Sequence, residues 1–579
     1  MKNVLRQLGR YRRDTWLCIA MTSLEVIMEI LLPFITALII DEGLEAASLP
    51  TVYRYGILMV VMSFCSLAFG ALGGKFAASA SSGLAANLRE AVYNNIQTFS
   101  FSNIDKFSVP GLVTRMTTDI TNVQNAYMML IRVAVRSPLM LVFSYIMCLI
   151  ISPKLSLTFL LAVLFLAIVL GVIIVVTMKI FTEVFSKYDD LNASVQENIS
   201  AIRVVKAFVR EDYENAKFSK ASNNLYRMFV KAEGLLAFNN PAMMLAVYFC
   251  IIMVSWLGAH FIVGGSMSAG ELTSLFSYVM SLMMSLMMLS MVVVMLTMSM
   301  ASIRRISEVL DETPDLAEPE QPVYDVADGS IDFDNVDFSY KHGSGKNALS
   351  GIDLHIRSGE TIGVIGGTGS GKSSLVNLIC RLYDTDKGTV RVGGLDVRRY
   401  DMESLRNQVS VVLQKNTLFS GTILDNLRWG NPDATEEECK AACQAACADE
   451  FIDRFPDGYN TRIERGGNNV SGGQKQRLCI ARALLKKPKV LILDDSTSAV
   501  DTATDAKIRA AFAKEIPGTT KIIIAQRISS VEHADRILVL DNGRINGFDT
   551  HENLLKTNAI YREIYESQVK GGGDFDQPA

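Results

Sequence analysis

Long apolar segments dominate the first half of the chain. Six of them extend over about 20 residues or more, which is the length that an α-helix needs to cross the hydrocarbon core of a bilayer. We therefore predict six membrane-spanning helices, near 16–40, 55–80, 128–151, 155–180, 242–264 and 271–300. The basic and partly apolar segment 1–15 is typical of an amphipathic helix that lies at the membrane surface.

The polar segments between these spans differ in length and charge. The connections 41–53 and 261–271 contain no Lys or Arg, whereas the segments 84–120 and 181–235 are long and rich in charges of both signs. Because Lys and Arg are retained on the cytoplasmic side of a membrane, we expect the long segments and both termini to be cytoplasmic.

The length of these two cytoplasmic segments predicts that spans two to five continue as helices well beyond the membrane. Each pair of such helices is then joined by a short turn at its tip, near 107–120 in one case and near 205–215 in the other. Helices that project so far need a surface to contact, and we expect the second half of the chain to supply it.

The second half has a different pattern. Ile331–Phe338 alternates between apolar and polar residues, except at Asp334–Asn335, and predicts a half-buried strand. Val490–Asp494 and Lys521–Ala525 are apolar runs that predict buried strands. The segment before them is acidic, contains prolines and lacks periodicity, as linkers do. The predicted division is a transmembrane domain at 1–310, a linker at 311–330, an α/β domain at 331–569 and a disordered tail at 570–579.

Composition supports this division. Hydrophobic residues make up 49% and charged residues 20% of the 579 residues, and the mean hydropathy of +0.25 is too high for a soluble enzyme of this size. The net charge of −4 gives no indication of a nucleic-acid partner. The nine cysteines are scattered, so we expect reduced thiols. Cys439, Cys443 and Cys447 recur every four residues, which is more typical of small buried residues than of a metal site.

The residues Gly366–Ser373 fit the P-loop pattern G-x-x-x-x-G-K-S between a predicted strand and a predicted helix. Backbone N–H groups of such a loop surround phosphate oxygens, and the start of the helix also favours an anion. Lys372 is expected to reach the β- and γ-phosphates, and Ser373 to bind Mg²⁺. The candidate phosphate-binding residues are Gly366, Gly367, Thr368, Gly369, Ser370, Gly371, Lys372, Ser373 and Ser374.

Further motifs surround the P-loop in the sequence. Asp494 ends a predicted buried strand and is expected beside the P-loop, where it can hold Mg²⁺ through water. Tyr340 precedes the P-loop strand and can stack on a base. A second candidate anion site, for a phosphate presented from elsewhere, opens the helix 475–485 and consists of Ser471, Gly472, Gly473 and Gln474.

Together these motifs resemble those of ABC transporters, and specifically exporters that fuse six spans to a nucleotide-binding domain. Gln414 matches the Q-loop, Ser471–Gln474 the signature, Asp494 the Walker B carboxylate, Asp501 the D-loop and Tyr340 the A-loop aromatic. The tips predicted above resemble coupling helices. The resemblance implies a membrane α-helical domain with long cytoplasmic extensions, fused to an α/β P-loop NTPase domain of the ABC ATPase type.

The resemblance also implies the cofactors and the assembly. ATP and Mg²⁺ are the expected cofactors, with Ser373, Gln414 and Asp494 at the metal. Two chains of this family pair head to tail, so that each ATP lies between the P-loop of one chain and the signature of the other. The residues expected at the catalytic position of this chain's P-loop site are Gln414, Asp495 and Gln526.

Two of these residues depart from the family pattern. Asp495 stands where a glutamate usually polarises the attacking water, and Gln526 stands where a histidine is usual. Both belong to the site that uses this chain's own P-loop, whereas the signature is intact. This pattern resembles heterodimeric bacterial multidrug exporters with one degenerate site. It predicts slow hydrolysis here and a partner chain whose active site Ser471–Gln474 completes. The alternative is a homodimer in which Asp495 is a slow but adequate base.

The membrane half contains two candidate substrate features. Glu25 and Glu29 lie one turn apart in the first span. They either face an aqueous cavity, where they attract cationic substrates or act as a proton-sensitive latch, or they bond to neighbouring helices. Met284, Met287 and Met291 in the last span follow helical spacing and form either an adaptable apolar surface or filling between helices.

The sequence therefore predicts ATP-driven export of amphiphilic molecules, hydrophobic or cationic, across the bacterial cytoplasmic membrane. Within transport, the alternatives are a lipid or peptide exporter and an importer on the same scaffold. From another class, the alternative is an ATP-gated channel or regulator. Vesicle uptake set against single-channel current would distinguish a pump from a channel.

Overall fold

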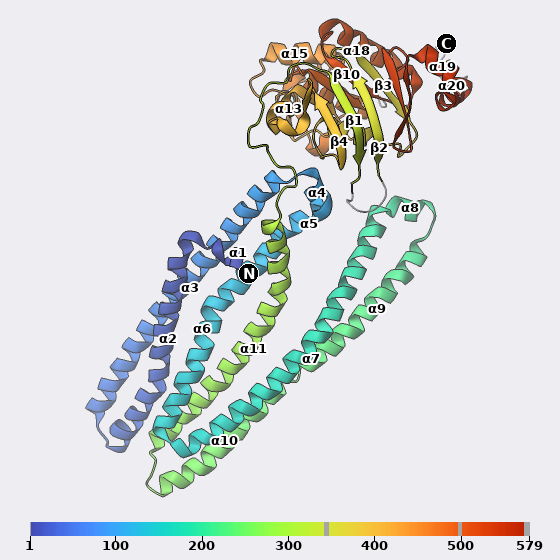
Figure 1. Cartoon of the computed structure of the whole chain (residues 1–579). Helices are drawn as coiled ribbons and strands as arrows, with labels where there is room; N and C mark the ends of the chain where they lie inside the picture. The colour runs from blue at the N-terminus through green and yellow to red at the C-terminus, as the bar shows by residue number, and fades with distance from the viewer. Residues whose placement is uncertain (1, 341–346, 496–500, 572–579) are drawn as a thin grey trace. The chain divides into compact units, whose positions relative to one another are not determined.

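The structure, a computed structural model, describes residues 2–340, 347–495 and 501–571 (Figure 1). It contains two compact units, one formed by Met1–Thr98 with Phe107–Glu312 and the other by Phe99–Lys106 with Thr313–Ala579. The chain therefore changes unit close to the predicted boundary at 310. In addition, a short segment from the first half of the sequence belongs to the second unit.

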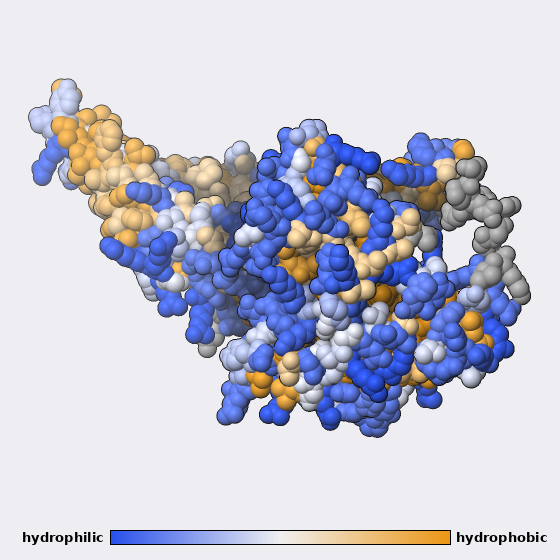
Figure 2. Space-filling view, turned by 90° about the horizontal axis from the view of Figure 1, so that it is seen from above, coloured by the Kyte–Doolittle hydropathy of each residue, from blue (hydrophilic) through white to orange (hydrophobic). Residues whose placement is uncertain are grey.

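The first unit is helical. Six helical segments among its described residues are long and apolar enough to cross a membrane, as the sequence predicts. Figure 2 shows hydrophobic surface gathered along these helices. The elements are α1 (Lys2–Arg6), η1 (Gly9–Tyr11), α2 (Arg12–Leu38), η2 (Ile39–Glu45), α3 (Leu49–Thr98), α5 (Val109–Thr114), η3 (Arg115–Asp119), α6 (Ile120–Ile151), α7 (Pro153–Ser200), α8 (Ile202–Ala207), α9 (Glu211–Leu236), α10 (Asn239–Val263) and α11 (Ala269–Asp311).

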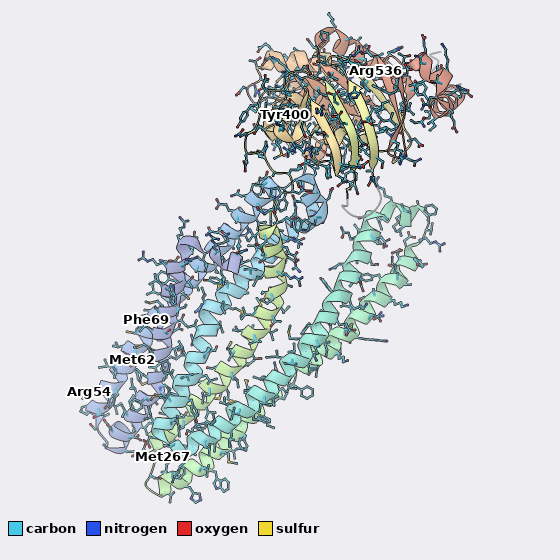
Figure 3. All side chains as sticks on the ribbon, in the orientation of Figure 1. Arg54, Met62, Phe69, Met267, Tyr400 and Arg536 are labelled. Atoms are coloured by element: carbon cyan, nitrogen blue, oxygen red, sulfur yellow. The ribbon has the colours of Figure 1, made fainter. Side chains whose placement is uncertain are left out.

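Two of these helices show directly that the spans extend beyond a bilayer. The helix α3 has 50 residues and α7 has 48. With a rise of roughly 1.5 Å per residue, each is more than twice as long as the hydrocarbon core of a membrane is thick. Figure 3 labels Arg54, Met62 and Phe69 along α3, in the part of that helix where apolar side chains face outward.

The short helices that join the long ones begin earlier than the predicted tips. They are α4 (Phe101–Phe107) and α8, which lies at the turn between α7 and α9 in Figure 1. The predicted ranges 107–120 and 205–215 instead include helix starts. Ser108 accepts a hydrogen bond from the N–H of Gly111 and so caps α5, which has a proline in its first turn. Three acidic residues occupy the first turn of α9, where they favour a helix N-terminus.

The second unit is built on one six-stranded and one four-stranded sheet. The larger sheet has the order β12-β11-β3-β10-β9-β6, and all its pairs are parallel except β11 with β12. The smaller sheet has the order β2-β1-β4-β5. The strands are β1 (Ile331–Phe338), β2 (Leu349–Ile356), β3 (Thr361–Gly366), β4 (Lys387–Val392), β5 (Leu395–Asp396), β6 (Val409–Val412), β7 (Gly421–Thr422), β8 (Arg462–Ile463), β9 (Val490–Asp494), β10 (Thr520–Ile524), β11 (Arg536–Asp541) and β12 (Arg544–Asp549).

Both faces of the larger sheet are buried. In β9, Val490 and Ile492 pack into one core cluster and Leu491 and Leu493 into the other. A parallel strand covered on both faces is apolar at successive positions, which is why these strands are readable as apolar runs.

The helices of this unit are α12 (Lys372–Ile379), α13 (Met402–Gln408), α14 (Ile423–Leu427), α15 (Glu436–Ala445), α16 (Asp449–Ile452), α17 (Gly472–Leu484), α18 (Thr502–Glu515), α19 (His551–Thr557) and α20 (Ala559–Gly571), with the 3-10 turns η4 (Val397–Arg399), η5 (Gly458–Asn460), η6 (Arg465–Gly467) and η7 (Ile528–Ser530).

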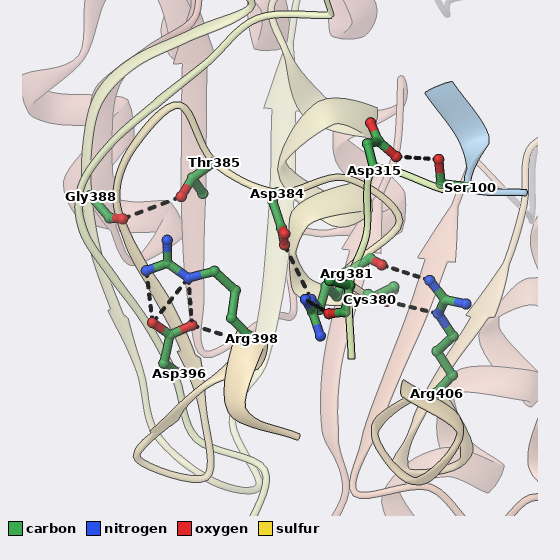
Figure 4. Close-up of polar contacts among 11 residues, drawn as sticks. Ser100, Asp315, Cys380, Arg381, Asp384, Thr385, Gly388, Asp396, Arg398 and Arg406 are labelled. Carbon is green, nitrogen blue, oxygen red and sulfur yellow. Dashed lines mark hydrogen bonds and ion pairs between the residues drawn. The ribbon is translucent and has the colours of Figure 1, made fainter. Parts of the chain in front are cut away.

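The segment Phe99–Lys106 is held in this unit by side-chain contacts. The hydroxyl of Ser100 donates a hydrogen bond to Asp315 (Figure 4), and the hydroxyl of Tyr383 donates to Asp105 at 2.8 Å. The linker is also anchored, because Arg381 donates to the carbonyl of Ala317 at 2.8 Å. The α4 helix and the start of the linker therefore share one surface of the second unit.

Candidate functional site: an ATP site at one edge of the parallel sheet

Four parallel strands deliver their C-terminal residues to one edge of the larger sheet. The strand β3 leads into the P-loop, β9 ends at Asp494, β10 is followed by Gln526, and β6 is followed by Gln414. Because the carboxyl ends of parallel strands lie at the same edge, residues more than 100 positions apart in the sequence meet there. The structure thus brings together the P-loop and three of the predicted motifs.

The P-loop has the local geometry that a phosphate site requires. A Cβ at Gly366 would lie 2.2 Å from the carbonyl oxygen of Leu540, so only glycine fits there. Gly371 has a φ of +101° and directly precedes α12. The Nζ of Lys372 donates to the carbonyls of Gly366 and Gly367 at 2.9 and 2.8 Å. The ammonium group therefore lies over the loop, and burial lowers its pKa against the opposing effect of Asp494 and Asp495.

Ser373 and Asp494 form the candidate Mg²⁺ position. The hydroxyl of Ser373 donates to Oδ2 of Asp494 at 2.9 Å. Burial raises the pKa of Asp494, and the Ser373 hydroxyl acts in the opposite direction. An oxygen-only pair of this kind suits Mg²⁺, which binds few protein ligands and retains water. The residues fit a magnesium nucleotide, whose bound metal would neutralise phosphate charge.

The two departures from the family pattern are in direct contact. Gln526 donates from Nε2 to Oδ2 of Asp495 at 2.8 Å, and Gln414 donates to the same oxygen at 3.3 Å. Asp495 is buried and has a φ of +49°, while its N–H donates to the carbonyl of Ile524 at 2.9 Å. Two amide donors therefore meet one carboxylate oxygen of Asp495, the residue that the sequence predicts at the catalytic position.

Tyr340 lies in an aromatic cluster beside the helix that follows the P-loop. Its ring contacts Phe338 and Tyr383 edge-on, with centroids 4.8 and 5.2 Å apart, and about half of the residue is exposed. Its hydroxyl lies 3.0 Å from Oγ of Ser374. A ring that is half exposed and held by edge-on contacts with its neighbours suits stacking on a base. Burial, and then the hydrogen bond to Asp105, raises the pKa of Tyr383 well above its usual range, which keeps it a neutral donor.

The signature segment forms a complete helix cap. Ser471 accepts from the N–H of Gln474 at 3.3 Å, and the side chain of Gln474 accepts from the N–H of Ser471 at 2.8 Å. Ser471 and Gly472 are exposed at the start of α17. Asp501 caps α18 by accepting from the N–H of Thr504 at 2.9 Å. The other D-loop residues, 498–500, lie outside the described residues.

The two intramembrane carboxylates are paired with an arginine that the sequence reading did not identify. Arg136 of α6 donates to Glu25 at 2.5 Å and to Glu29 at 2.6 Å. A Cβ at Gly70 of α3 would lie 3.0 Å from Glu25, so the small residue allows the close approach. Of the two alternatives for this pair, the geometry matches bonding to a neighbouring helix. The feature of the sequence that could have identified Arg136 is its position as a cation within an apolar span.

The methionines of the last span are mostly exposed within the described chain. Met284, Met287 and Met291 are 61%, 44% and 56% exposed, whereas Met283 is buried. The three predicted residues therefore do not fill space between helices of this chain. Cys439, Cys443 and Cys447 are buried, and the described residues contain no cluster of three His, Cys, Asp or Glu that could hold a metal.

Comparisons with known proteins agree with this architecture. The family described as ABC transporter transmembrane region matches residues 15–301, and the family described as ABC transporter matches residues 349–498. The chain is 35% identical to the uncharacterized ABC transporter ATP-binding protein YfiB of Bacillus subtilis over 568 residues, or 98% of each chain. It is 36% identical over 575 residues to the protein Rv1273c of Mycobacterium tuberculosis, again over 98% of each.

The fold also matches a solved structure. An ABC exporter described as a bacterial Atm1-family exporter with ATP bound superposes with a TM-score of 0.83 at 26% identity, covering 96% of this chain and 99% of that one. The match includes both the six apolar helical segments and the sheet whose edge carries the P-loop. From this agreement of sequence, fold and site, the chain belongs to the ABC transporters and is an ATP-driven exporter with six transmembrane helices and an ABC ATPase domain.

Proposed function

We propose that this chain is one subunit of a heterodimeric exporter whose own P-loop binds ATP but hydrolyses it slowly. Its Ser471–Gln474 segment would complete a hydrolysing site on the partner. The observation that carries the proposal is the environment of Asp495, where the amides of Gln526 and Gln414 both donate to Oδ2.

Slow hydrolysis follows from the reach and the surroundings of Asp495. The aspartate carboxylate is retracted by one C–C bond relative to a glutamate, and a misplacement of about 1 Å can reduce a rate by about 10²-fold. The two amides occupy lone pairs of the same oxygen, which would otherwise accept from a water. Gln526 can donate to a phosphate but carries neither the charge of a protonated histidine nor a transferable proton.

ATP binding does not depend on these departures. The P-loop, Lys372, and the contact of Ser373 with Asp494 are formed as a magnesium nucleotide requires. The half-exposed ring of Tyr340 is available to a base. A site that binds but does not turn over would favour the closed pair of nucleotide domains for longer than a fully active site does.

The location of the departures supports a heterodimer. Asp495 and Gln526 both serve the site at this chain's own P-loop, while the signature cap is complete and exposed. In a homodimer, both sites would combine an intact signature with an impaired base. A partner with glutamate and histidine at the corresponding positions leaves one efficient site per pair. The homodimer with Asp495 as a slow base remains the alternative that the experiment below tests.

Exposed apolar surfaces support a second subunit. At the tip around α8, Phe208 and Val209 are 72% and 80% exposed. On the nucleotide domain, Phe419 and Trp429 stack with centroids 4.0 Å apart and remain about half exposed in a groove that Arg482 also lines. Apolar side chains grouped on a polar, cytoplasmic part of a protein are typical of interfaces. We propose that the partner's corresponding tip docks in this groove.

The proposed substrates are amphiphilic molecules. The exposed face of Met284, Met287 and Met291 supplies a flexible, polarisable surface that can adapt to several shapes. Arg136 offsets one of the two negative charges of Glu25 and Glu29, so the preference for cations is weaker than two free carboxylates would give. We place the protein in a bacterial cytoplasmic membrane with both termini inside, because of its charge distribution and its similarity to bacterial proteins.

The ATPase rate of the chain alone and with its partner tests the heterodimer. We expect the purified chain alone to hydrolyse ATP at less than about a tenth of the rate of the pair. We also expect Asp495→Ala in the pair to change that rate by less than about twofold, because the partner's site performs the hydrolysis. Substantial turnover by the chain alone that Asp495→Ala abolishes would instead show a homodimer with an aspartate base.

Truncation of the methionine face tests the substrate class. We expect Met284→Ala, Met287→Ala and Met291→Ala together to weaken binding of amphiphilic dyes by about tenfold, because apolar contact area is removed. Dye-stimulated ATPase activity of the pair in nanodiscs measures this, with one cationic and one neutral dye. Met300→Ala is the control, because Met300 is also exposed but lies on another face of the same helix. Equal effects of the two variants would contradict the assignment.

A further inference from the structure

The C-terminal helix α20 contacts the loop that carries Gln526. The side chain of Gln568 donates from Nε2 to the carbonyl oxygen of Gln526 at 2.8 Å. Its Oε1 accepts from the N–H of Ile528, also at 2.8 Å. One amide side chain therefore bridges two backbone groups on either side of Arg527. This geometry leaves the side chain of Gln526 free to reach Asp495.

The position of Gln568 is itself fixed by packing. Tyr561 of α20 is fully buried, its hydroxyl lies 2.7 Å from Nδ1 of His551, and its N–H donates to Asn558 at 2.9 Å. Ile528 is buried in the same apolar cluster as Tyr561. The helix thus rests on the turn that follows β10, and Gln568 approaches the loop from an anchored element.

We propose that Gln568 is a positioning residue for the nucleotide site, through which α20 sets the direction of the Gln526 side chain. Three hydrogen bonds of 2.8 Å connect Ile528 and Gln526 to Gln568, and Gln526 to Asp495. One N–H of the Gln526 amide bonds to Asp495. When ATP is bound, its second N–H would be the donor to the terminal phosphate. This inference rests on the proposed ATP binding at this P-loop, but it does not depend on whether the site hydrolyses.

The consequence is a difference between ATP and ADP. A donor at Gln526 acts on the γ-phosphate, which ADP lacks. A hydrogen bond to a charged group is stronger than one between neutral groups, but it requires correct direction. Loss of the Gln568 bridge lets the backbone of Gln526 move, so ATP should bind more weakly while ADP binds as before. A general loss of folding would weaken both nucleotides together.

The experiment uses the full-length chain in nanodiscs, with EDTA present so that hydrolysis does not enter the measurement. Gln568→Ala removes the bridge. Ser567→Ala is the matched control, because Ser567 is exposed and, among the described residues, its hydroxyl bonds only within α20, to the carbonyl of Ile564 at 2.8 Å. The measurements are the dissociation constants of ATP and ADP and the hydrogen exchange of the backbone amides at 526–530.

We expect Gln568→Ala to weaken ATP binding by about fivefold without changing ADP binding, and to speed exchange at Ile528 by about tenfold. Gln568→Glu retains the acceptor for Ile528 but not the donor to Gln526, so exchange at Ile528 should stay slow while ATP binding weakens. Adding Gln526→Ala to Gln568→Ala should cause no further loss of ATP affinity, because both act on one contact.

Two results would overturn the proposal. One is no change in either the ATP or the ADP affinity of Gln568→Ala, and the other is an equal loss of both affinities. Neither result bears on the heterodimer, which the ATPase rates test. Conversely, rapid hydrolysis at this site would contradict the proposed function. It would not change the ratio of ATP to ADP affinity, because that ratio is measured in EDTA.

Discussion

Replacing Asp495 by Glu and Gln526 by His together raises ATP turnover at this chain's own site by about 10²-fold. Glutamate extends the carboxylate by one C–C bond towards the position of the attacking water. Histidine removes the amide that lies 2.8 Å from Oδ2 of Asp495 and supplies a side chain that can carry charge. The remaining parts of the site, Lys372 and the pair of Ser373 with Asp494, are already in place.

The measurement requires a partner subunit whose own site does not hydrolyse ATP. The proposed pair is prepared with a partner subunit whose catalytic carboxylate is replaced by an amide, so that the remaining hydrolysis reports on this chain's P-loop. The single variants Asp495→Glu and Gln526→His serve as controls and should each restore only part of the rate, because the base and its neighbour act as a unit. If the double variant hydrolyses no faster than the parent, the two residues are not what limits this site.

Replacing Arg136 by Met destabilises the helical unit by about 3 kcal/mol, because it leaves two carboxylates in the membrane without their cation. Glu25 is buried, its Oε1 accepts from Arg136, and its Oε2 has no hydrogen-bond partner within the described residues. Thermal unfolding of the detergent-solubilised protein measures the effect. We expect a clearly lower Tm and a lower yield of monodisperse protein than for the parent.

Two further variants separate the loss of charge pairing from the loss of arginine itself. Arg132→Met is the matched control, because Arg132 lies one turn earlier on α6, whereas the ion pairs with Glu25 and Glu29 are made by Arg136. The triple change of Arg136→Met with Glu25→Gln and Glu29→Gln removes all three charges and should recover much of the lost stability. If Arg132→Met is as damaging as Arg136→Met, the ion pairs are not the cause.

The fold could be predicted where a sequence pattern indicates a single structure. Apolar runs of about 20 residues have no other stable solution than a spanning helix. The P-loop and Asp494 could be placed together because each follows a buried strand, and parallel strands end at the same edge. The contact between Asp495 and Gln526 has the same origin. Ile524 and Asp494 are paired in register on the neighbouring strands β10 and β9, so the residues that follow these strands lie close together.

Other features depend on which face of a helix meets which neighbour. Arg136 lies 111 residues from Glu25, and only the packing of α6 on α2 brings them together. Gln568 lies 42 residues from Gln526 in a helix whose own pattern gives no sign of a nucleotide site. The tip boundaries shifted because Pro110 and the acidic residues after Arg210 begin helices, which the change from apolar to polar residues does not reveal.

The segment Phe99–Lys106 can form its contacts only after the second half of the chain has been synthesised. Ser100 is 215 residues from its partner Asp315, and Asp105 is 278 residues from Tyr383. At typical rates of translation, the ribosome needs roughly tens of seconds to add the residues that this segment contacts. Until then, the segment lacks its docking surface and is accessible to chaperones and proteases. Substitutions on the surface of the nucleotide domain around Tyr383 should therefore reduce the amount of protein in the membrane before they alter its activity.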